Sequence, residues 1–159
     1  MLWKVRRDFL SRVPVFADLS QRDLKAVAKS CSETSYPDGE YLCRQGERGV
    51  AAFLIVSGLV SVDNELPGGE LIKLAELGQG SMVGELSIID GAERVASVQA
   101  IGEVQALVLT QWSMQGLLKD RPSIAAAMLP IVVKRFRETT AELRHRESDS
   151  SHSRESVYQ

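Results

Sequence analysis

A glutamate and an arginine bracket a short loop in the middle of the chain. The loop opens with Gly84-Glu85-Leu86, turns at Asp90-Gly91 and closes at Arg94. Backbone N–H groups and one guanidinium in such a loop can neutralise a small anion, and a carboxylate can accept hydrogen bonds from ligand hydroxyls. The spacing therefore predicts a site for a small anionic ligand. The alternative is a structural ion pair across a turn, or two solvated side chains.

The segments on both sides of this loop have the pattern of short strands separated by turns. Turn sequences such as Pro37-Asp38-Gly39 and Leu66-Pro67-Gly68-Gly69 recur between residues 32 and 110. A spacing of about 8–12 residues between turns is typical of antiparallel sandwiches and barrels. We therefore predict an antiparallel β region resembling eight short strands around the loop.

Helices are predicted before and after the β region. Residues 4–12 and a segment capped by Ser20 precede it, and residues 111–119 follow it. A longer helix begins at Pro122, where a proline fits the first turn, and runs to roughly Arg146. We predict an α+β domain over residues 1–146 and a disordered, Ser-rich polar tail over residues 147–159.

Apolar side chains form a stripe along the predicted long helix. The stripe comprises Ile124, Met128, Ile131, Val132, Phe136, Thr140 and Leu143. A stripe of this length packs on the β core, on a second copy of the helix, or on both. A homodimer through this helix is therefore one expected partner. Trp112, at the start of the preceding helix, is predicted to pack in the core or at a hinge.

Composition excludes several classes of protein. The net charge of −2 and the pI near 5.7 give no overall attraction to nucleic acid. The sequence has no signal peptide and no apolar run approaching the ~18 residues of a membrane span, so we expect a cytoplasmic protein without membrane contact. Cys31 and Cys43 are predicted to be buried or half-buried thiols in a reducing compartment. The two histidines, His145 and His152, lie beyond the β region, which argues against a metal-dependent enzyme of the cupin type.

These motifs together resemble the cyclic nucleotide-binding domain family. The resemblance rests on the Gly84-Glu85-Leu86 triplet, its nine-residue spacing from Glu85 to Arg94, and Ala96 two residues later. It extends to the upstream segments Pro37-Asp38-Gly39-Glu40, Gln45-Gly46 and Ile55-Val56-Ser57-Gly58, and to Gly80. Over about residues 9–146 the likeness is to the sensor half of catabolite activator-type bacterial regulators. It implies a β jelly roll flanked by helices.

The resemblance also implies roles for individual residues. Arg94 is expected to pair with a cyclic phosphate, since a buried phosphate monoanion is matched best by a permanently charged planar donor. Glu85 is expected to accept a hydrogen bond from a ribose 2′-hydroxyl. The backbone groups expected to complete the pocket are those of Gly84, Leu86, Val95 and Ala96.

The resemblance implies a purine contact on the long helix. In activator-type relatives two adjacent hydroxyl residues meet the base, and Thr139 and Thr140 occupy those positions here. Val95 replaces a serine that adds a phosphate contact in many bacterial relatives, or a threonine that reaches guanine in cGMP-preferring ones. Valine can do neither, so we expect cAMP rather than cGMP as the ligand.

The expected function is therefore non-catalytic sensing of a cyclic nucleotide, coupled to movement of the C-terminal helix. The alternative is a degenerate domain that no longer binds nucleotide and acts in interaction or dimerisation. Val95 and Glu93, where many relatives have proline, favour the alternative, whereas Glu85 and Arg94 oppose it.

The output of such a sensor requires a partner. The residues after the long helix are too few and too polar for a helix-turn-helix, so direct DNA binding is not expected. An unknown protein partner, carrying an output domain on another polypeptide, is expected instead.

Overall fold

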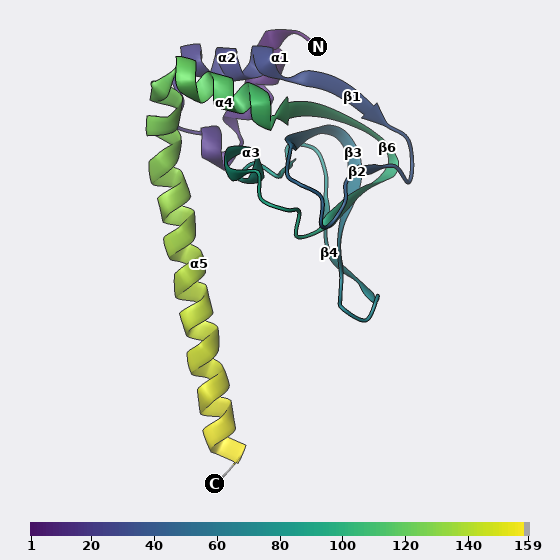
Figure 1. The fold of residues 1–159 in the computed structure, drawn as a ribbon, viewed down its shortest axis with the longest axis vertical. Coiled ribbons are helices and arrows are strands. Elements are labelled where there is room, and N and C mark those ends of the chain that lie inside the picture. Colours follow the sequence, from purple (N-terminus) through teal and green to yellow (C-terminus); the bar gives the residue numbers. More distant parts are fainter. Residues whose placement is uncertain (158–159) are drawn as a thin grey trace.

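The computed structural model describes the backbone of residues 1–157 and the side chains of residues 1–151. Three short helical segments come first: α1 (Trp3–Ser11), the 3-10 turn η1 (Pro14–Phe16) and α2 (Gln21–Ser30). The middle of the chain forms β1 (Ser32–Tyr36), β2 (Tyr41–Cys43), β3 (Ala51–Glu65), β4 (Leu71–Leu77), β5 (Met82–Val83), helix α3 (Ser87–Asp90) and β6 (Ser97–Thr110). The chain ends in α4 (Gln111–Asp120) and α5 (Pro122–Val157). This order confirms the predicted α+β architecture (Figure 1).

The two long strands β3 and β6 lie at the centre of the sheet. They pair antiparallel along most of their length, and the order β1-β6-β3-β4 is extended by β2 on β6 and β5 on β3. Within residues 1–157 the sheet has six strands, fewer than the eight short strands expected from the turn spacing. The segments on either side of Gly58 form one bent strand, and so do the segments on either side of residues 101–103. Register shifts flank Gly58, and Gly58 and Gly102 both have positive φ, so the strands bend without ending.

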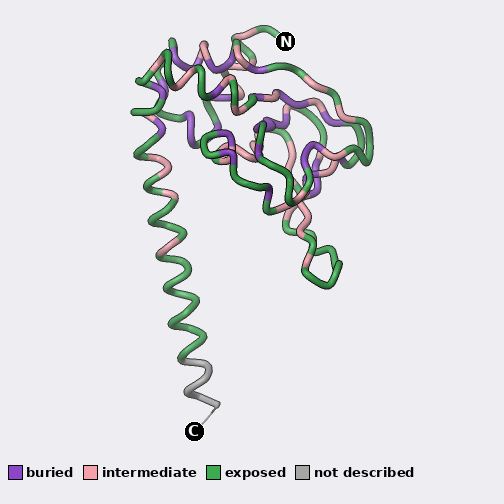
Figure 2. Tube along the Cα trace, in the orientation of Figure 1, coloured by how far each residue is buried: buried purple, intermediate pink, exposed green. Residues whose placement is uncertain are grey.

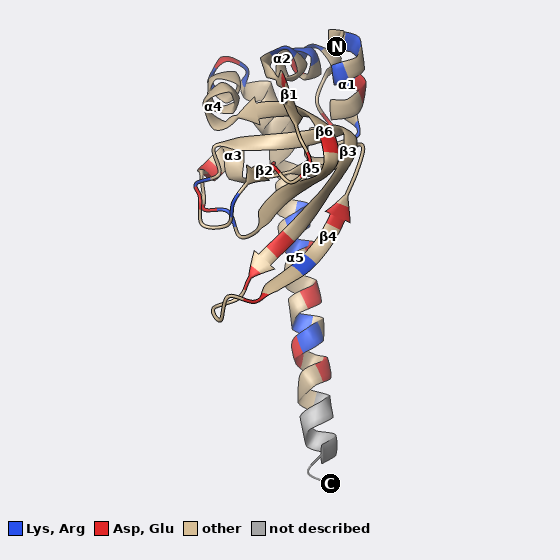
Figure 3. Cartoon of the chain, turned by 90° about the vertical axis from the view of Figure 1, so that its right-hand side faces the viewer, with Lys and Arg blue, Asp and Glu red and all other residues tan. Residues whose placement is uncertain are grey.

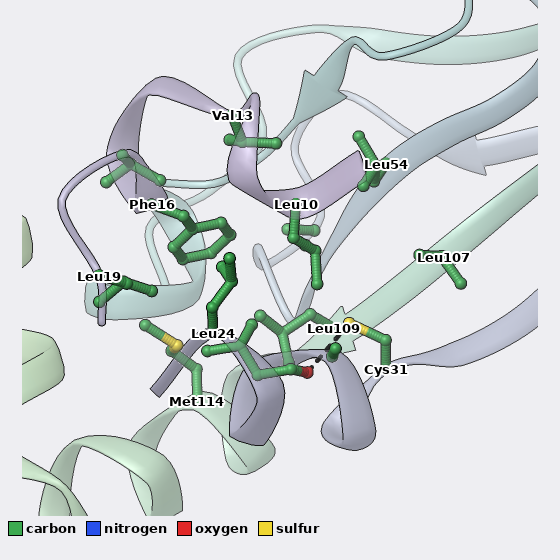
Figure 4. Close-up of a cluster of buried hydrophobic side chains, with 14 of the residues drawn as sticks. Leu10, Val13, Phe16, Leu19, Leu24, Cys31, Leu54, Leu107, Leu109 and Met114 are labelled. Carbon is green, nitrogen blue, oxygen red and sulfur yellow. Dashed lines mark hydrogen bonds between the residues drawn. The ribbon is translucent and has the colours of Figure 1, made fainter. Parts of the chain in front are cut away.

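The main core lies between the sheet and the helices. Figure 4 shows Leu10, Phe16 and Leu24 from the N-terminal helices facing Leu54 and Leu109 from the sheet. Cys31 belongs to this core, and its thiol donates to the Val27 carbonyl at 3.4 Å. A second cluster, around Phe53, Ile55 and Val98, fills the inside of the curved sheet. Cys31 and Cys43 are both buried thiols, as predicted.

Buried polar contacts tie the N-terminal helices to the junction of α4 and α5. The side chain of Ser20 caps α2 by accepting from the Asp23 N–H at 3.1 Å. The Asp23 carboxylate is buried and accepts from the Ser123 hydroxyl at 2.6 Å and from Arg121 at 3.4 Å. The first turn of α5 is thereby fixed to the body of the domain.

Trp112 is not in the core, so the prediction for this residue was wrong. Its side chain lies on the outer face of α4 and is 84% exposed. Met114, two residues later, points inward and is fully buried. The helical rotation of about 100° per residue separates the two side chains onto opposite faces.

Helix α5 extends far beyond the body (Figure 2). Its predicted stripe divides into two parts: Ile124 and Met128 are buried, whereas Phe136 and Leu143 are 72% and 55% exposed. The sequence predicts a helix end near Arg146 and a disordered tail, but the helix continues to Val157. No proline or glycine interrupts residues 147–157, so nothing in the local sequence ends the helix. Residues 158 and 159 lie outside the described residues.

None of the helices in residues 1–157 combines the length and hydropathy that crossing a membrane requires.

Candidate functional site

The loop around Arg94 closes one side of a cavity of about 450 Å³ inside the curved sheet. The opposite wall is apolar and includes Cys43, Val62 and Leu77. The loop contributes the polar side, with Glu85, Ser87, Asp90, Glu93 and Arg94. A ligand with one apolar face and one anionic, hydroxyl-bearing edge matches this division.

Arg94 is the charged centre of the cavity wall. Its side chain is buried, and its guanidinium donates to the Ser87 hydroxyl at 2.8 Å and to the Ala51 carbonyl. The guanidinium carbon lies 5.8 Å from the centroid of the Phe53 ring. The backbone of Arg94 is held as well, because its N–H donates to Glu47 at 2.6 Å. A cation fixed at both ends and desolvated in this way is suited to holding an anion.

Gly84 lets the loop pass close to that guanidinium. Its φ is +79°, and a Cβ at this position would collide with Nη1 of Arg94 and lie 3.1 Å from the Ala51 carbonyl oxygen. Positive φ is strained for residues that carry a Cβ. Glycine is therefore required here both for the turn and for the space that Arg94 occupies.

Glu85 lines the cavity and also forms an ion pair with a residue of the C-terminal helix. Its Oε1 accepts from Nη1 of Arg135 on α5 at 2.8 Å. A carboxylate has several acceptor positions, so this contact leaves Glu85 able to accept from a ligand hydroxyl. The ion pair connects the cavity wall directly to the C-terminal helix.

Backbone donors complete the loop. In residues 1–157, the N–H groups of Leu86, Val95 and Ala96 make no hydrogen bond to another backbone group. The Val95 carbonyl accepts a hydrogen bond at 2.6 Å from the side chain of Asn64, a residue outside the loop. The Val95 side chain is 80% exposed. Unused N–H groups near a buried guanidinium are suitable donors to phosphate oxygens.

The structure brings six of the eight predicted site residues to one cavity. These are Gly84, Glu85, Leu86, Arg94, Val95 and Ala96. Thr139 and Thr140 do not line it. Their hydroxyls donate to the carbonyls of Arg135 and Phe136, each at 2.9 Å, within α5 itself. Their contact with a purine stays a prediction.

Two site residues were missed by the sequence reasoning. Ser87 orients Arg94 and also donates to the Gly84 carbonyl at 3.0 Å, and its place three residues after Gly84 was a usable local signal. Arg135 had no such signal, because it lies 50 residues from Glu85 in the sequence.

Burial affects the one thiol in the cavity wall. Desolvation raises the pKa of Cys43 above its ordinary value, and the nearby positive charge of Arg94 opposes this shift. Cys43 is therefore a neutral thiol near pH 7 and forms part of the apolar wall. In the described residues no group of three or more His, Cys, Asp or Glu side chains could hold a metal ion.

Comparison with known proteins agrees with this geometry. Residues 33–121 match the sequence profile described as "Cyclic nucleotide-binding domain". The chain is 29% identical over 136 residues to the CRP-like cAMP-activated global transcriptional regulator of Mycobacterium tuberculosis, covering 86% of this chain and 61% of that protein. It is 31% identical over 130 residues to the cyclic AMP receptor protein of Thermus thermophilus, covering 82% of this chain and 60% of that protein. The chain therefore spans about 60% of the length of these two regulators.

Among solved structures, the chain is similar to the N-terminal domain of a transcriptional regulator from Streptomyces coelicolor A3(2). The two share 33% sequence identity and a TM-score of 0.77, over 83% of this chain and 94% of that domain. Residues 33–121, which the sequence profile matches, include α3 and the loop that carries Glu85 and Arg94. On the profile match, the shared fold and the arrangement of the loop, the chain belongs to the cyclic nucleotide-binding domain family.

Proposed function

We propose that this domain is a non-catalytic sensor of cAMP. The observation that carries the proposal is the buried Arg94 guanidinium in the wall of a cavity of about 450 Å³, with the Glu85 carboxylate on the same loop. Arg94 would neutralise the cyclic phosphate, and the backbone N–H groups of Leu86, Val95 and Ala96 would donate to its oxygens. Glu85 would accept from the ribose 2′-hydroxyl while keeping its contact with Arg135.

The preference for cAMP over cGMP rests on Val95. Its side chain carries no hydroxyl that could donate to or accept from a guanine. Two of the similar regulators are named for cAMP, which supports the same choice.

The proposed response is a population shift of α5, since a ligand that binds one conformation better than another shifts their equilibrium. The Glu85–Arg135 ion pair provides a physical connection between the cavity and this helix. Thr139 and Thr140 lie outside the cavity lining, so their contact with the purine requires either a shift of α5 or the α5 of a second chain. Hydrogen exchange over residues 123–143 tests the coupling, and identical exchange with and without saturating cAMP would refute it.

A homodimer through α5 is part of the proposal. Up to residue 151, the large exposed apolar side chains of this helix are Leu129, Val133, Phe136 and Leu143, and Thr140 completes a spacing of four, three, four and three residues. This alternation is typical of a helix that packs along a partner helix. Sedimentation analysis should show a dimer that Phe136→Glu dissociates. The matched change Lys134→Glu, which lies off this stripe, should leave the dimer intact.

Calorimetric titration with cAMP, cGMP and AMP tests the central assignment. We expect cAMP to bind most tightly, because its cyclic phosphate monoanion matches Arg94 and Val95 offers no hydroxyl to a guanine. Absence of binding by every cyclic nucleotide at millimolar concentration would exclude a sensor. It would instead favour the second candidate, a degenerate interaction module. The observation in favour of that alternative is that Ser87, Ala51 and Arg135 already satisfy Arg94 and Glu85 within the chain.

A further inference from the structure

Positive charge is concentrated at the N-terminal end of the chain. Residues 1–31 contain seven Lys or Arg and three Asp or Glu, whereas residues 32–110 contain four and twelve. The N-terminal helices thus carry a net charge of +4 beside a β region of −8. Figure 3 shows the basic residues of α1 and α2 gathered at the end of the molecule opposite the C-terminus.

The cations of α2 lie on one face of that helix. Arg22, Lys25 and Lys29 are spaced by three and four residues, which places them in a single row. In residues 1–151 no ion pair joins Arg22 or Lys29 to a carboxylate, and both side chains are exposed. A row of like charges at this spacing destabilises a helix by itself, and an anionic partner would remove that cost.

Helix α1 contributes two more cations, Lys4 and Arg7. The Trp3 ring links the two helices, because Lys25 Nζ lies 4.5 Å and Arg7 Cζ 5.3 Å from its centroid. Cation–π contacts of this kind restrict where the two charges can lie. We call Lys4, Arg7, Arg22, Lys25 and Lys29 the basic helical face.

The acidic residues of the same segment neutralise one of the five cations of this face. Asp8 is paired with Arg7 at 3.3 Å, and Asp23 is buried against Ser123 and Arg121. Asp18 lies in the connection between η1 and α2, outside the helical row. The positive charge of the face therefore remains largely available to a partner.

A groove of about 380 Å³ runs beside the face, between the end of α2 and α4. It is lined by Ser30 from α2 and by Trp112, Gly116, Lys119 and Asp120 from α4. Gly116 leaves space in its floor, since no heavy atom outside its neighbours lies within 4 Å of where a Cβ would be. The exposed Trp112 ring gives the groove an apolar wall, and Ser30 in the groove directly follows Lys29 of the row. Trp is over-represented among the residues that anchor protein interfaces.

We propose that the basic helical face and this groove form a docking surface for an acidic protein segment that carries a bulky apolar side chain. The carboxylates would lie along Arg22, Lys25 and Lys29, and the apolar side chain would enter the groove against Trp112. Charge complementarity favours a short segment over an extended polyanion. A membrane or a nucleic acid duplex would also approach the β region, whose net charge of −8 repels it.

The test uses a fluorescein-labelled peptide of eight glutamates with one central leucine, and its binding to the full chain is followed by polarisation at low salt. Arg22→Glu with Lys29→Glu should weaken binding by about tenfold or more, because two attractive contacts become repulsive. The matched pair Lys134→Glu with Arg137→Glu on α5 changes the net charge equally and should have less than about a twofold effect.

Trp112→Ala tests the contribution of the groove to peptide binding independently of the contribution of the cations. It should weaken the leucine-containing peptide by about fivefold or more and leave an all-glutamate peptide of the same length unaffected. Equal losses from the two charge-reversal pairs would overturn the proposal. Tighter binding of phosphatidylserine vesicles, duplex DNA or a second copy of this chain through the same residues would also overturn it, since the occupant would then be wrong.

Discussion

Nη1 of Arg135 lies 2.8 Å from Oε1 of Glu85, so the middle of α5 is ion-paired to the loop that carries Arg94. The Glu85 side chain is 16% exposed and that of Arg135 is 42% exposed. The contact therefore sits at the edge of the body, where α5 begins to leave it. Few other described contacts join this part of the helix to the cavity wall.

Arg135→Ala should loosen α5 without unfolding the domain. A partly exposed ion pair contributes about 1 kcal/mol or less, so the free energy of unfolding should change little. Hydrogen exchange in the ligand-free protein should nevertheless become faster around residues 131–140. Arg137→Ala, an exposed change on the same helix, serves as the control. If both variants exchange alike, the ion pair does not restrain α5.

Gly84→Ala should abolish ligand binding, whereas Gly69→Ala should not. Both glycines have positive φ, +79° and +84°, so both variants should lose about 1–2 kcal/mol of stability. Only at Gly84 would the added Cβ displace the Arg94 guanidinium, because no heavy atom lies within 4 Å at Gly69. Thermal denaturation and calorimetry with cAMP measure the two effects separately. Equal affinities of the two variants would contradict the role given to Gly84.

Arg94→Ala should weaken cAMP binding by about 2–4 kcal/mol, or roughly 30- to 1,000-fold, since it leaves a buried phosphate charge unpaired. Arg94→Lys should recover only part of this loss, because an ammonium cannot reproduce the planar fork of a guanidinium. Calorimetry on the three proteins gives the comparison. Full recovery by lysine would show that charge alone, and not geometry, determines binding.

Ser87→Ala should weaken cAMP binding by roughly 10- to 150-fold. The Ser87 hydroxyl accepts from Arg94 at 2.8 Å, and loss of a hydrogen bond to a charged group costs about 1.5–3 kcal/mol. Ser35→Ala, which removes an exposed hydroxyl at the far end of the sheet, is the control. An unchanged affinity in Ser87→Ala would mean that Ala51 and the backbone position Arg94 without it.

Cys31 should make the protein less stable at alkaline pH. Burial raises the pKa of its thiol from 9.0 to about 11, and the charge of Arg6 opposes the shift only in part. The unfolded chain then ionises this thiol above pH 9 while the folded chain does not, so stability is retained below pH 9 and falls between pH 9 and 11. The loss attributable to Cys31 should reach about 2–3 kcal/mol. Cys31→Ala should show a shallower decline over this range in urea denaturation, and parallel curves would contradict the assignment.

Features that depend on neighbouring residues could be predicted from the sequence. The starts of α2 and α5 follow from Ser20 and Pro122, and the cavity loop follows from the spacing between Glu85 and Arg94. In each case the interacting groups lie within about ten residues, so local backbone geometry brings them together.

Features that depend on tertiary contacts could not be predicted in this way. The pairing of Arg135 with Glu85 joins residues 50 positions apart, and no periodicity encodes it. Trp112 was placed in the core by its residue type, yet the register of α4 turns it outward and Met114 inward. The merging of strands into β3 and β6 depends on which partner strand each segment meets, because a glycine can either end a strand or bend it.

The length of α5 gives it the mechanical character of a lever. The helix contains 36 residues, which corresponds to about 54 Å at the usual rise per residue. It is fixed near one end by Ile124, Met128 and the contact of Ser123 with Asp23. A tilt of about 10° at that pivot would carry the other end through about 9 Å, close to the diameter of a helix. The same tilt would move the helix by only about 3 Å beside Glu85, roughly 17 Å from the pivot, so a displacement at the cavity wall would be amplified about threefold at the far end of the helix.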